Sequence, residues 1–232
     1  MFKLKLALLI VGLLITSTSV LCKPTYSFLK DRTVYIKGVH TVSTSETGKK
    51  TRGTWVGTGI VYTVKDNYTY ILTNAHVAGK NHVDVSLYVE SYLGFVGATV
   101  VQLYSGADLA MMKVQGTLGR KQPIGLVRMN VNVQEPVYVV GHHLGRPYVY
   151  GEGVVAGRDK SSNALIVQVP CAFGNSGSGV FDEKGNLVGV VFAISRIGPF
   201  GVDVAHALAV NGISVILFIE SIPELAGTLN YK

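Results

Sequence analysis

The stretch CAFGNSGSGV, residues 171–180, sets two serines among glycines and an asparagine, between two apolar runs. Glycine and asparagine accept a positive φ at little cost, so a cluster of this kind is by itself usually only a tight turn. The same freedom suits a turn that presents a nucleophilic serine, because backbone amides reach a reacting atom only where bulky side chains are absent. The rest of the chain decides between these two interpretations.

Short apolar runs separated by turn signals extend over most of the 232 residues, on both sides of this stretch. Hydrophobic residues make up 48% of the chain and charged residues 15%, which argues against a disordered protein. We expect strands in two sets, the first within residues 33–114 and the second within residues 136–210. Many short strands with regular turns predict an all-β fold, a sandwich or barrels, rather than alternating strands and helices.

The closing run NGISVILFIESIPEL, residues 211–225, has a different pattern. Its apolar residues recur at helical spacing, Asn211 or Ser214 is a suitable N-cap, and Pro223 is expected to stop the helix. We therefore predict a C-terminal helix packed on the second set of strands.

The first 22 residues have a short basic start, an apolar run from Leu6 to Ile15 and a small-polar stretch, the layout of a secretory signal peptide. A retained membrane anchor is the alternative, because the segment from Leu4 to Leu21 approaches spanning length. We expect a secreted or periplasmic protein, and a membrane contact only if this segment is retained. Its removal takes away two lysines and lowers the net charge from +7 to +5. The remaining basic residues are mostly dispersed, so no nucleic-acid partner is expected.

Three polar residues of the types that serine chemistry needs stand beside apolar runs. His76 lies in LTNAHV directly after such a run, Asp108 lies in GADLAMMKV directly before one, and Ser176 lies in the glycine-rich stretch. Each alone has an ordinary structural interpretation. Together they fit acyl transfer, which needs a base near the serine, a carboxylate that fixes the imidazole tautomer, and N–H donors for the oxyanion. Gly174 allows its amide to lie beside that of Ser176.

The order of these residues, carried by TNAH, DLAMMKV and GNSGSGVFDEKGNLVGV, resembles the chymotrypsin-like serine proteases. The HtrA/Deg and glutamyl-endopeptidase branches of bacterial and viral enzymes are the most similar, from about residue 33 to the C-terminal helix. The resemblance implies two perpendicular six-stranded Greek-key β-barrels with a C-terminal α-helix and a cleft between the barrels. The implied parts are residues 1–22 as signal peptide, 23–118 as the barrel with His76 and Asp108, and 119–232 as the barrel with Ser176 and the helix.

The resemblance also implies a role for each site residue of a serine endopeptidase that acts through an acyl-enzyme. His76 is the general base, Asp108 orients it, Ser176 is the nucleophile, and the amides of Gly174 and Ser176 form the oxyanion hole. The residues expected to bind the polypeptide substrate are Val191, Phe192 and Ala193 along its backbone, and Pro170, Cys171 and His206 around its P1 side chain.

Departures from the family pattern narrow the expected specificity. Cleavage after Lys or Arg needs an acid six residues before the nucleophile, where this chain has Pro170. His206 either shortens the pocket for small apolar P1 side chains or hydrogen-bonds an acidic or amide one, and a purely structural role fits equally well. Asn175 replaces the acid that pairs with a freed N-terminus in digestive members, so no such activation switch is expected. No PDZ domain is recognised in the chain.

Two other functions compete with this assignment, an α/β-hydrolase and an inactive peptide-binding module. An α/β-hydrolase needs G-x-S-x-G before a helix and its histidine last, and Ser178 breaks that motif. A catalytically inactive, protease-like module that binds peptides stays open as the alternative. We expect no cofactor, and no metal because the adjacent His142 and His143 have poor ligand spacing and are expected to be loop residues. Once Cys22 is cleaved away, Cys171 has no disulfide partner and is expected to be a pocket-lining thiol.

Overall fold

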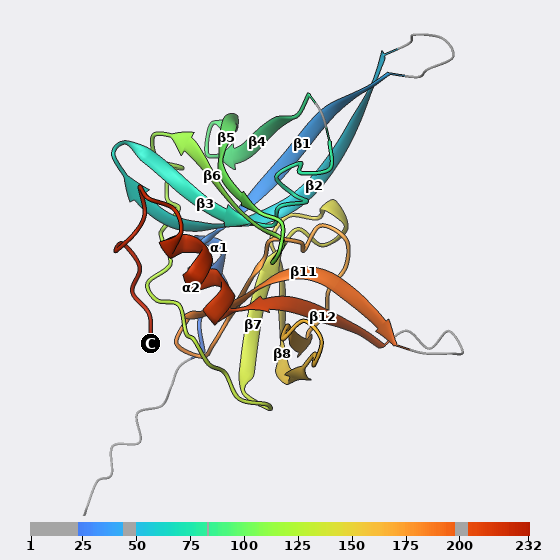
Figure 1. Cartoon of the computed structure of the whole chain (residues 1–232), viewed down its shortest axis with the longest axis vertical. Coiled ribbons are helices and arrows are strands. Elements are labelled where there is room, and N and C mark those ends of the chain that lie inside the picture. The colour runs from blue at the N-terminus through green and yellow to red at the C-terminus, as the bar shows by residue number, and fades with distance from the viewer. Residues whose placement is uncertain (1–22, 44–49, 83, 198–203) are drawn as a thin grey trace, which may run out of the picture.

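The computed structural model describes residues 23–43, 50–82, 84–197 and 204–232, and the predicted signal peptide lies outside them. These residues form two closed antiparallel barrels of six strands each, the upper and lower halves of the molecule in Figure 1. The first barrel contains β1 (Thr33–Ser43), β2 (Lys50–Lys65), β3 (Tyr68–Thr73), β4 (Ser86–Ser91), β5 (Gly94–Tyr104) and β6 (Leu109–Gln115). The second contains β7 (Pro136–Gly141), β8 (Val149–Arg158), β9 (Leu165–Gln168), β10 (Gly179–Phe181), β11 (Leu187–Ile197) and β12 (Val204–Asn211).

Both barrels have the same strand order. In the first the neighbours run β1-β2-β3-β6-β5-β4, and in the second the corresponding order is β7-β8-β9-β12-β11-β10. The prediction of an all-β fold with two six-stranded barrels is therefore confirmed. Strands β1 to β6 lie within the predicted segment 23–118, and β7 to β12 lie within 119–232.

Alternation along the strands divides the apolar residues between the barrel interiors and a core shared by both barrels. In β3, Ile71 points into the first barrel, whereas Tyr70 and Leu72 belong to the shared core. The same strand reads as an uninterrupted apolar run because both of its faces are buried. The shared core also contains Tyr138 and Val190 of the second barrel, so it joins the two barrels.

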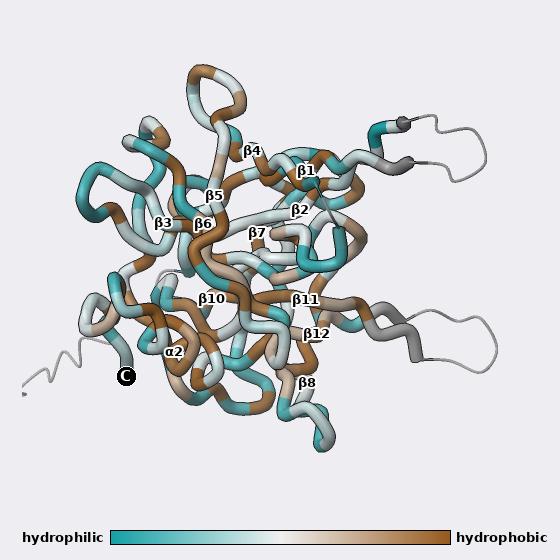
Figure 2. Tube along the Cα trace, turned by 45° about the horizontal axis from the view of Figure 1, so that its top comes forward, coloured by the Kyte–Doolittle hydropathy of each residue, from teal (hydrophilic) through white to brown (hydrophobic). Residues whose placement is uncertain are grey.

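The C-terminal helix α2 (Gly212–Glu220) packs its apolar face on this shared core, visible as the brown helix in Figure 2. The Asn211 side chain caps it by accepting a hydrogen bond from the N–H of Ser214 at 3.0 Å. The predicted helix is confirmed, although it ends at Glu220, before Pro223 is reached. A short helix, α1 (Tyr26–Lys30), was not predicted, since its five residues are too few to show a helical period.

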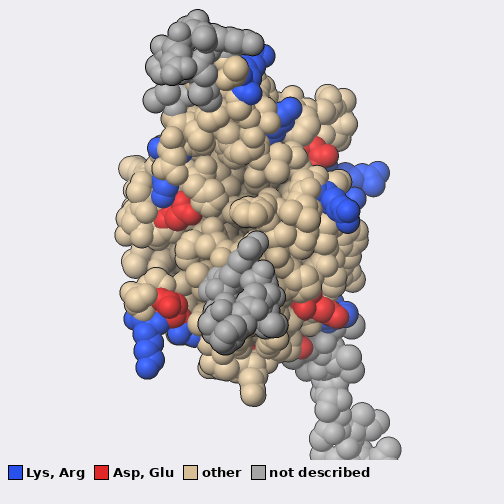
Figure 3. All heavy atoms as spheres, turned by 90° about the vertical axis from the view of Figure 1, so that its right-hand side faces the viewer, with Lys and Arg blue, Asp and Glu red and all other residues tan. Residues whose placement is uncertain are grey.

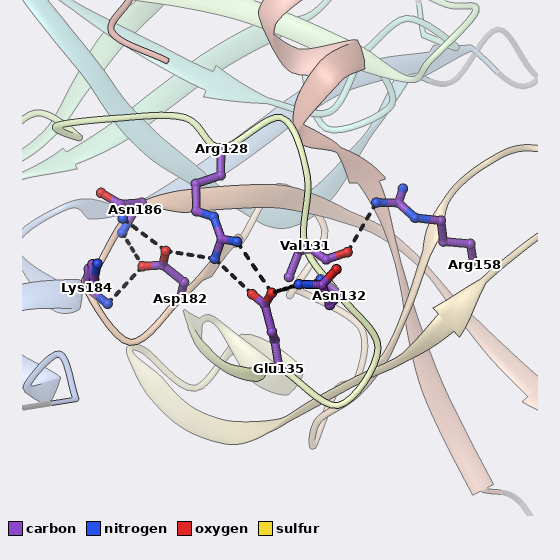
Figure 4. Close-up of polar contacts among 8 residues, drawn as sticks. All are labelled: Arg128, Val131, Asn132, Glu135, Arg158, Asp182, Lys184 and Asn186. Carbon is purple, nitrogen blue, oxygen red and sulfur yellow. Dashed lines mark hydrogen bonds and ion pairs between the residues drawn. The ribbon is translucent and has the colours of Figure 1, made fainter. Parts of the chain in front are cut away.

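The chain between the barrels is held by a network of charged and amide side chains, drawn in Figure 4. The Arg128 guanidinium lies 2.8 Å from a Glu135 oxygen and 3.2 Å from an Asp182 oxygen. Asp182 is 5% exposed, and its other oxygen accepts hydrogen bonds from the backbone N–H groups of Lys184 and Asn186. This network fastens the inter-barrel segment to the turn between β10 and β11.

Charged side chains are scattered over the face of the molecule in Figure 3, with acidic residues interspersed among the basic ones. They do not gather into one patch of a single sign on that face. Among the described residues, no helix is long and apolar enough to cross a membrane.

Candidate active site

His76 follows β3 in a tight turn that fixes the direction of its side chain. The turn is closed by hydrogen bonds from the N–H of Ala78 to the Asn74 carbonyl at 3.0 Å and from the N–H of Lys80 to the Ala75 carbonyl at 3.0 Å. The His76 side chain is 34% exposed, so one edge of its ring is open to solvent.

Asp108 stands directly before β6 and meets His76 with both carboxylate oxygens. One oxygen lies 2.6 Å from His76 Nδ1, and the other accepts the His76 backbone N–H at 3.0 Å. The Asp108 carbonyl is held in turn by the N–H of Ala75 at 3.1 Å and by the side-chain amide of Asn74 at 3.0 Å. These contacts determine the imidazole orientation, with Nδ1 facing the carboxylate and Nε2 facing away from it.

The electrostatics of Asp108 favour its ionised form. Burial alone would raise the pKa of this carboxyl, but hydrogen bonds from the His76 ring and backbone, together with Lys80, outweigh burial and hold the pKa below its ordinary value. Lys80 Nζ lies 3.2 Å from the carboxylate oxygen that also accepts the His76 backbone N–H. An ionised Asp108 accepts the Nδ1 proton, so Nε2 carries the free lone pair.

Ser176 lies in a turn whose carbonyl groups are all hydrogen-bonded within the protein. Gly174 and Gly177 of this turn have φ of +97° and +87°, which accounts for the glycines in the sequence. The four carbonyls of residues 173–176 each accept one hydrogen bond: Phe173 from Leu144 N–H (2.6 Å), Gly174 from the Thr58 hydroxyl (2.7 Å), Asn175 from Ser178 N–H (2.9 Å) and Ser176 from Thr58 N–H (2.8 Å).

The N–H groups of Gly174 and Ser176, in contrast, donate no hydrogen bond to any other described residue. Two free amides on either side of one residue are the arrangement that stabilises an oxyanion. Gly174, Ser176 and His76 line a single pocket of about 420 Å³. In the described part of the chain no hydrogen bond joins the Ser176 hydroxyl to His76, which is common before a substrate is bound.

The predicted substrate strand lies beside this turn. The Val191 N–H donates to the Ser178 carbonyl, and the Val191 carbonyl accepts from the Gly177 N–H, so β11 directly abuts the turn that contains Ser176. β10 pairs with β11 only as far as Val190, and Phe192 stands at a bulge opposite β12. The edge of β11 from Phe192 onward is therefore not covered by β10. Phe192 also lines a second cavity of about 330 Å³ with Tyr104.

The residues predicted around the P1 side chain lie in different settings. Pro170 is exposed, and Cys171 is half-buried against the core of the second barrel. Burial raises the pKa of the Cys171 thiol to about 11, and a hydrogen bond with Asn175 lowers this pKa by a smaller amount. A thiol in this state is a poor nucleophile. His206 lies opposite Ser195, two residues beyond the Ala193–Leu208 pair, so the register places Leu208 rather than His206 next to Ala193.

Three polar residues of the site were missed by reasoning from the sequence. Lys80 contacts Asp108, Thr58 contacts the nucleophile turn, and His142, expected to be a loop residue, is fully buried beside Thr58. Thr58 stands within an apolar strand pattern, GTGIVYTV, where a polar residue with neighbouring glycines was the available signal.

Comparison with known proteins identifies the family to which the chain is similar. A model described as a trypsin-like peptidase domain matches residues 57–190. The HtrA-like serine proteases of Staphylococcus epidermidis and Staphylococcus haemolyticus are 27% and 29% identical to the chain over 194 and 153 residues, or 76% and 59% of its length. The chain spans only 31% and 24% of those relatives.

Solved structures show the same fold. The HtrA-type protease AlgW with decapeptide superposes with a TM-score of 0.67 and 18% identity, over 87% of this chain and 68% of that one. A variant of the same protease with decapeptide gives a TM-score of 0.69 over 85% and 66% of the two chains. The family model covers more than half of the chain, including His76, Asp108 and Ser176. The chain therefore belongs to the trypsin-like peptidase family.

Proposed function

We propose that the protein is a serine endopeptidase in which Ser176 is the nucleophile, His76 the general base and Asp108 the carboxylate that orients it. One observation carries the proposal. His76, held by Asp108 at 2.6 Å, lines the same pocket as Gly174 and Ser176, whose N–H groups are free to bind an oxyanion. Membership in the trypsin-like peptidase family supports the same assignment.

The first half of the reaction forms an acyl-enzyme. The Ser176 hydroxyl oxygen attacks the peptide carbonyl carbon while its proton passes to Nε2 of His76. The carbonyl π electrons move onto oxygen, and the N–H groups of Gly174 and Ser176 stabilise the resulting negative charge. Asp108 stabilises the imidazolium. When the tetrahedral intermediate collapses, the C–N bond breaks and Nε2 returns its proton to the leaving amine.

The second half repeats these steps with water. His76 takes a proton from the water that attacks the ester carbonyl, the oxyanion forms again beside Gly174, and the C–O bond to Ser176 breaks. Nε2 then protonates the serine oxygen, which releases the new carboxylic acid and restores the enzyme.

We infer that the substrate is a polypeptide that adds a strand to the open edge of β11 at Phe192 and Ala193. Val191, also expected to bind the substrate backbone, already has its N–H and carbonyl hydrogen-bonded to Ser178 and Gly177. The decapeptide held by AlgW, a protein of the same fold, supports this class of substrate. Because Pro170 supplies no acid, we propose that the P1 residue is small and apolar, or acidic or amide if His206 reaches it. We also propose that residues 1–22 direct export and that the first barrel ends and the second begins at residue 118.

A fluorophosphonate probe tests the catalytic assignment. The folded wild-type protein should be labelled at Ser176, and the Ser176→Ala and His76→Ala variants should not. Absence of labelling in a folded wild-type protein that still binds peptide would establish the alternative, an inactive peptide-binding module.

Profiling the sites cleaved in a peptide library tests the P1 assignment separately. The His206→Ala variant should change the preference at P1, with Tyr231→Ala, an exposed aromatic residue, as a control. An unchanged preference removes His206 from the P1 pocket and leaves the catalytic assignment intact.

A further inference from the structure

A buried pair of polar residues connects the first barrel to the nucleophile turn of the second. Thr58 lies on β2, His142 follows β7, and both are 0% exposed. Thr58 contacts the turn twice, through its N–H to the Ser176 carbonyl at 2.8 Å and through its hydroxyl to the Gly174 carbonyl at 2.7 Å. The catalytic assignment leaves the role of this pair unexplained, because neither residue lines the pocket of His76 and Ser176.

Counting protons determines the direction of every hydrogen bond around the Thr58 hydroxyl. A carbonyl only accepts, so the single hydroxyl proton must go to Gly174. The His142 backbone N–H lies 3.2 Å from Thr58 Oγ1 and takes one of its lone pairs. His142 Nδ1, at 3.0 Å, must then donate to the other lone pair. The hydroxyl then has no further hydrogen bond to make, and the buried His142 Nε2 has no partner among the described residues. Burial lowers the pKa of His142, so the ring is the neutral tautomer with its proton on Nδ1.

His142 is itself held in place by its surroundings. The rings of Tyr35 and Tyr148 meet its imidazole edge to face, with centroids 4.6 Å and 4.8 Å away. Its carbonyl accepts the N–H of Gly145 at 2.9 Å. A Cβ on Gly174 would lie 2.1 Å from that same carbonyl, so the two backbones are as close as a glycine permits. The direction in which Nδ1 donates is thus fixed before any substrate arrives.

The hydroxyl of Thr58 fixes one of the two peptide planes that flank Gly174. The preceding plane is fixed by the hydrogen bond from Leu144 to the Phe173 carbonyl, and the following plane by the hydrogen bond from Thr58 to the Gly174 carbonyl. With both planes set, φ and ψ of Gly174 have no freedom left, and its N–H must point into the cleft. The Gly174 N–H belongs to the preceding plane, whereas the plane that Thr58 holds carries the Gly174 carbonyl and the Asn175 N–H, which donates to the Ala172 carbonyl at 3.1 Å. This plane lies between those of the Gly174 and Ser176 N–H groups, so loss of the Thr58 bond loosens ψ of Gly174 and the orientation of the two N–H groups relative to each other.

We propose that Thr58 is a positioning residue of the oxyanion hole: its hydroxyl, oriented by Nδ1–H of His142, holds the peptide plane between Gly174 and Asn175 and so keeps the N–H groups of Gly174 and Ser176 directed at one oxyanion. This inference rests on the proposed peptidase function. The donors that stabilise the transition state in the second barrel are thereby aligned by a side chain of the first. Misalignment weakens an interaction made only in the transition state, so kcat should respond and KM should not.

The test compares Thr58→Val, which keeps the shape and removes the hydroxyl, with Thr58→Ser, which keeps the hydroxyl. For folded protein we expect Thr58→Val to lower kcat by about 10- to 100-fold with KM within about threefold, somewhat less than the loss of a whole oxyanion donor. Thr58→Ser should stay within about threefold of wild type. Thr69→Val is the matched control, because the buried Thr69 hydroxyl also donates to a glycine carbonyl, that of Gly116 at 2.7 Å.

A second readout does not require activity. The amide resonance of Gly174 in a ¹H–¹⁵N spectrum should shift in Thr58→Val and keep its wild-type position in Thr58→Ser and Thr69→Val. If Thr58→Val does not fold, His142→Phe replaces it, since it retains the ring packing and removes the Nδ1–H donor; its kcat should fall about three- to tenfold.

Wild-type kcat in a folded Thr58→Val, failure of Thr58→Ser to restore kcat, or an unmoved Gly174 resonance would each overturn the inference. If Thr58→Val does not fold, wild-type kcat in a folded His142→Phe variant would likewise overturn the inference. A wild-type protein that neither cleaves peptides nor reacts with fluorophosphonate would instead overturn the proposed function, and the Gly174 resonance would still decide the positioning role.

Discussion

The side chain of Asp108 holds His76 at two points, the ring nitrogen Nδ1 at 2.6 Å and the backbone N–H at 3.0 Å. Because the two contacts use different carboxylate oxygens, the carboxylate plane and the imidazole ring are fixed relative to each other. In the proposed mechanism His76 is therefore a base whose orientation is set in advance, although no hydrogen bond joins it to Ser176 in the described part of the chain.

Replacement of Asp108 by asparagine should abolish most activity without unfolding the protein. An amide presents N–H groups where the carboxylate presented oxygens, which favours the imidazole tautomer with its proton on Nε2 and removes the base. We expect kcat to fall by about 10³- to 10⁴-fold, the loss typical of such triads, with KM little changed. Asp66→Asn is a matched control, because Asp66 is exposed and shares the positive φ of Asp108, 50° against 51°. Equal kcat in the two variants would contradict the role of Asp108.

A methyl group on Gly174 should destroy the oxyanion hole. Its φ of +97° disfavours any side chain, and a Cβ there would approach the His142 carbonyl to 2.1 Å. Gly174→Ala should reduce kcat by at least about 100-fold, the scale of one lost oxyanion donor. Gly227→Ala separates the two effects, because Gly227 has φ of +73° and open space around it. In urea unfolding, Gly227→Ala should lose about 1 kcal/mol of unfolding free energy, and its kcat should equal that of the wild type. A Gly174→Ala variant with wild-type kcat would contradict the role of the Gly174 N–H.

The parts of this protein that the sequence predicted are those with a local signature. Alternating and continuous apolar runs gave the strands, Asn211 indicated the start of α2, and the glycines around Ser176 indicated a turn with exposed amides. Each of these signals lies within a few residues of the feature it predicts.

The contacts that were not predicted join residues far apart in the chain. The Thr58 hydroxyl meets a carbonyl 116 residues away and an imidazole 84 residues away, and no local pattern indicates either partner. His142 was expected to be a loop residue, and it does lie outside the strands, but its burial between Tyr35 and Tyr148 depends on the closure of both barrels. The residues around the P1 side chain could not be predicted for the same reason. The strand register decides whether His206 or Leu208 lies beside Ala193, and no local pattern shows that register.

The pocket on the leaving-group side of Ser176 should favour an apolar residue after the scissile bond. It contains no residue of β11 and is lined by Trp55, whose ring stacks on His82 at 4.6 Å, and by Leu144 and Phe173, which are 62% and 74% exposed. Partial burial of a leucine there is worth about 1 kcal/mol, or about fivefold in KM. Phe173→Ala should raise KM by that factor for substrates with leucine at this position and leave substrates with glycine unchanged. Tyr231→Ala, a distant exposed aromatic, is the control, and an equal change for both substrates would contradict this use of the pocket.

Burial of His142 should make the protein less stable in mild acid. Burial, reinforced by the positive charge of Lys121, lowers the pKa of His142 to about 3 from its ordinary value of 6.5. Between these values the unfolded chain binds more protons than the folded one, so the unfolding free energy falls as the pH drops below 6.5. At pH 5 the loss due to this residue is about 2 kcal/mol. Urea unfolding at pH 7 and pH 5 measures it, and His142→Phe should lose about 2 kcal/mol less than wild type over this interval. The low pKa of Asp108 places its own effect below this range, so an equal loss in both proteins would show that His142 is not buried as a neutral imidazole.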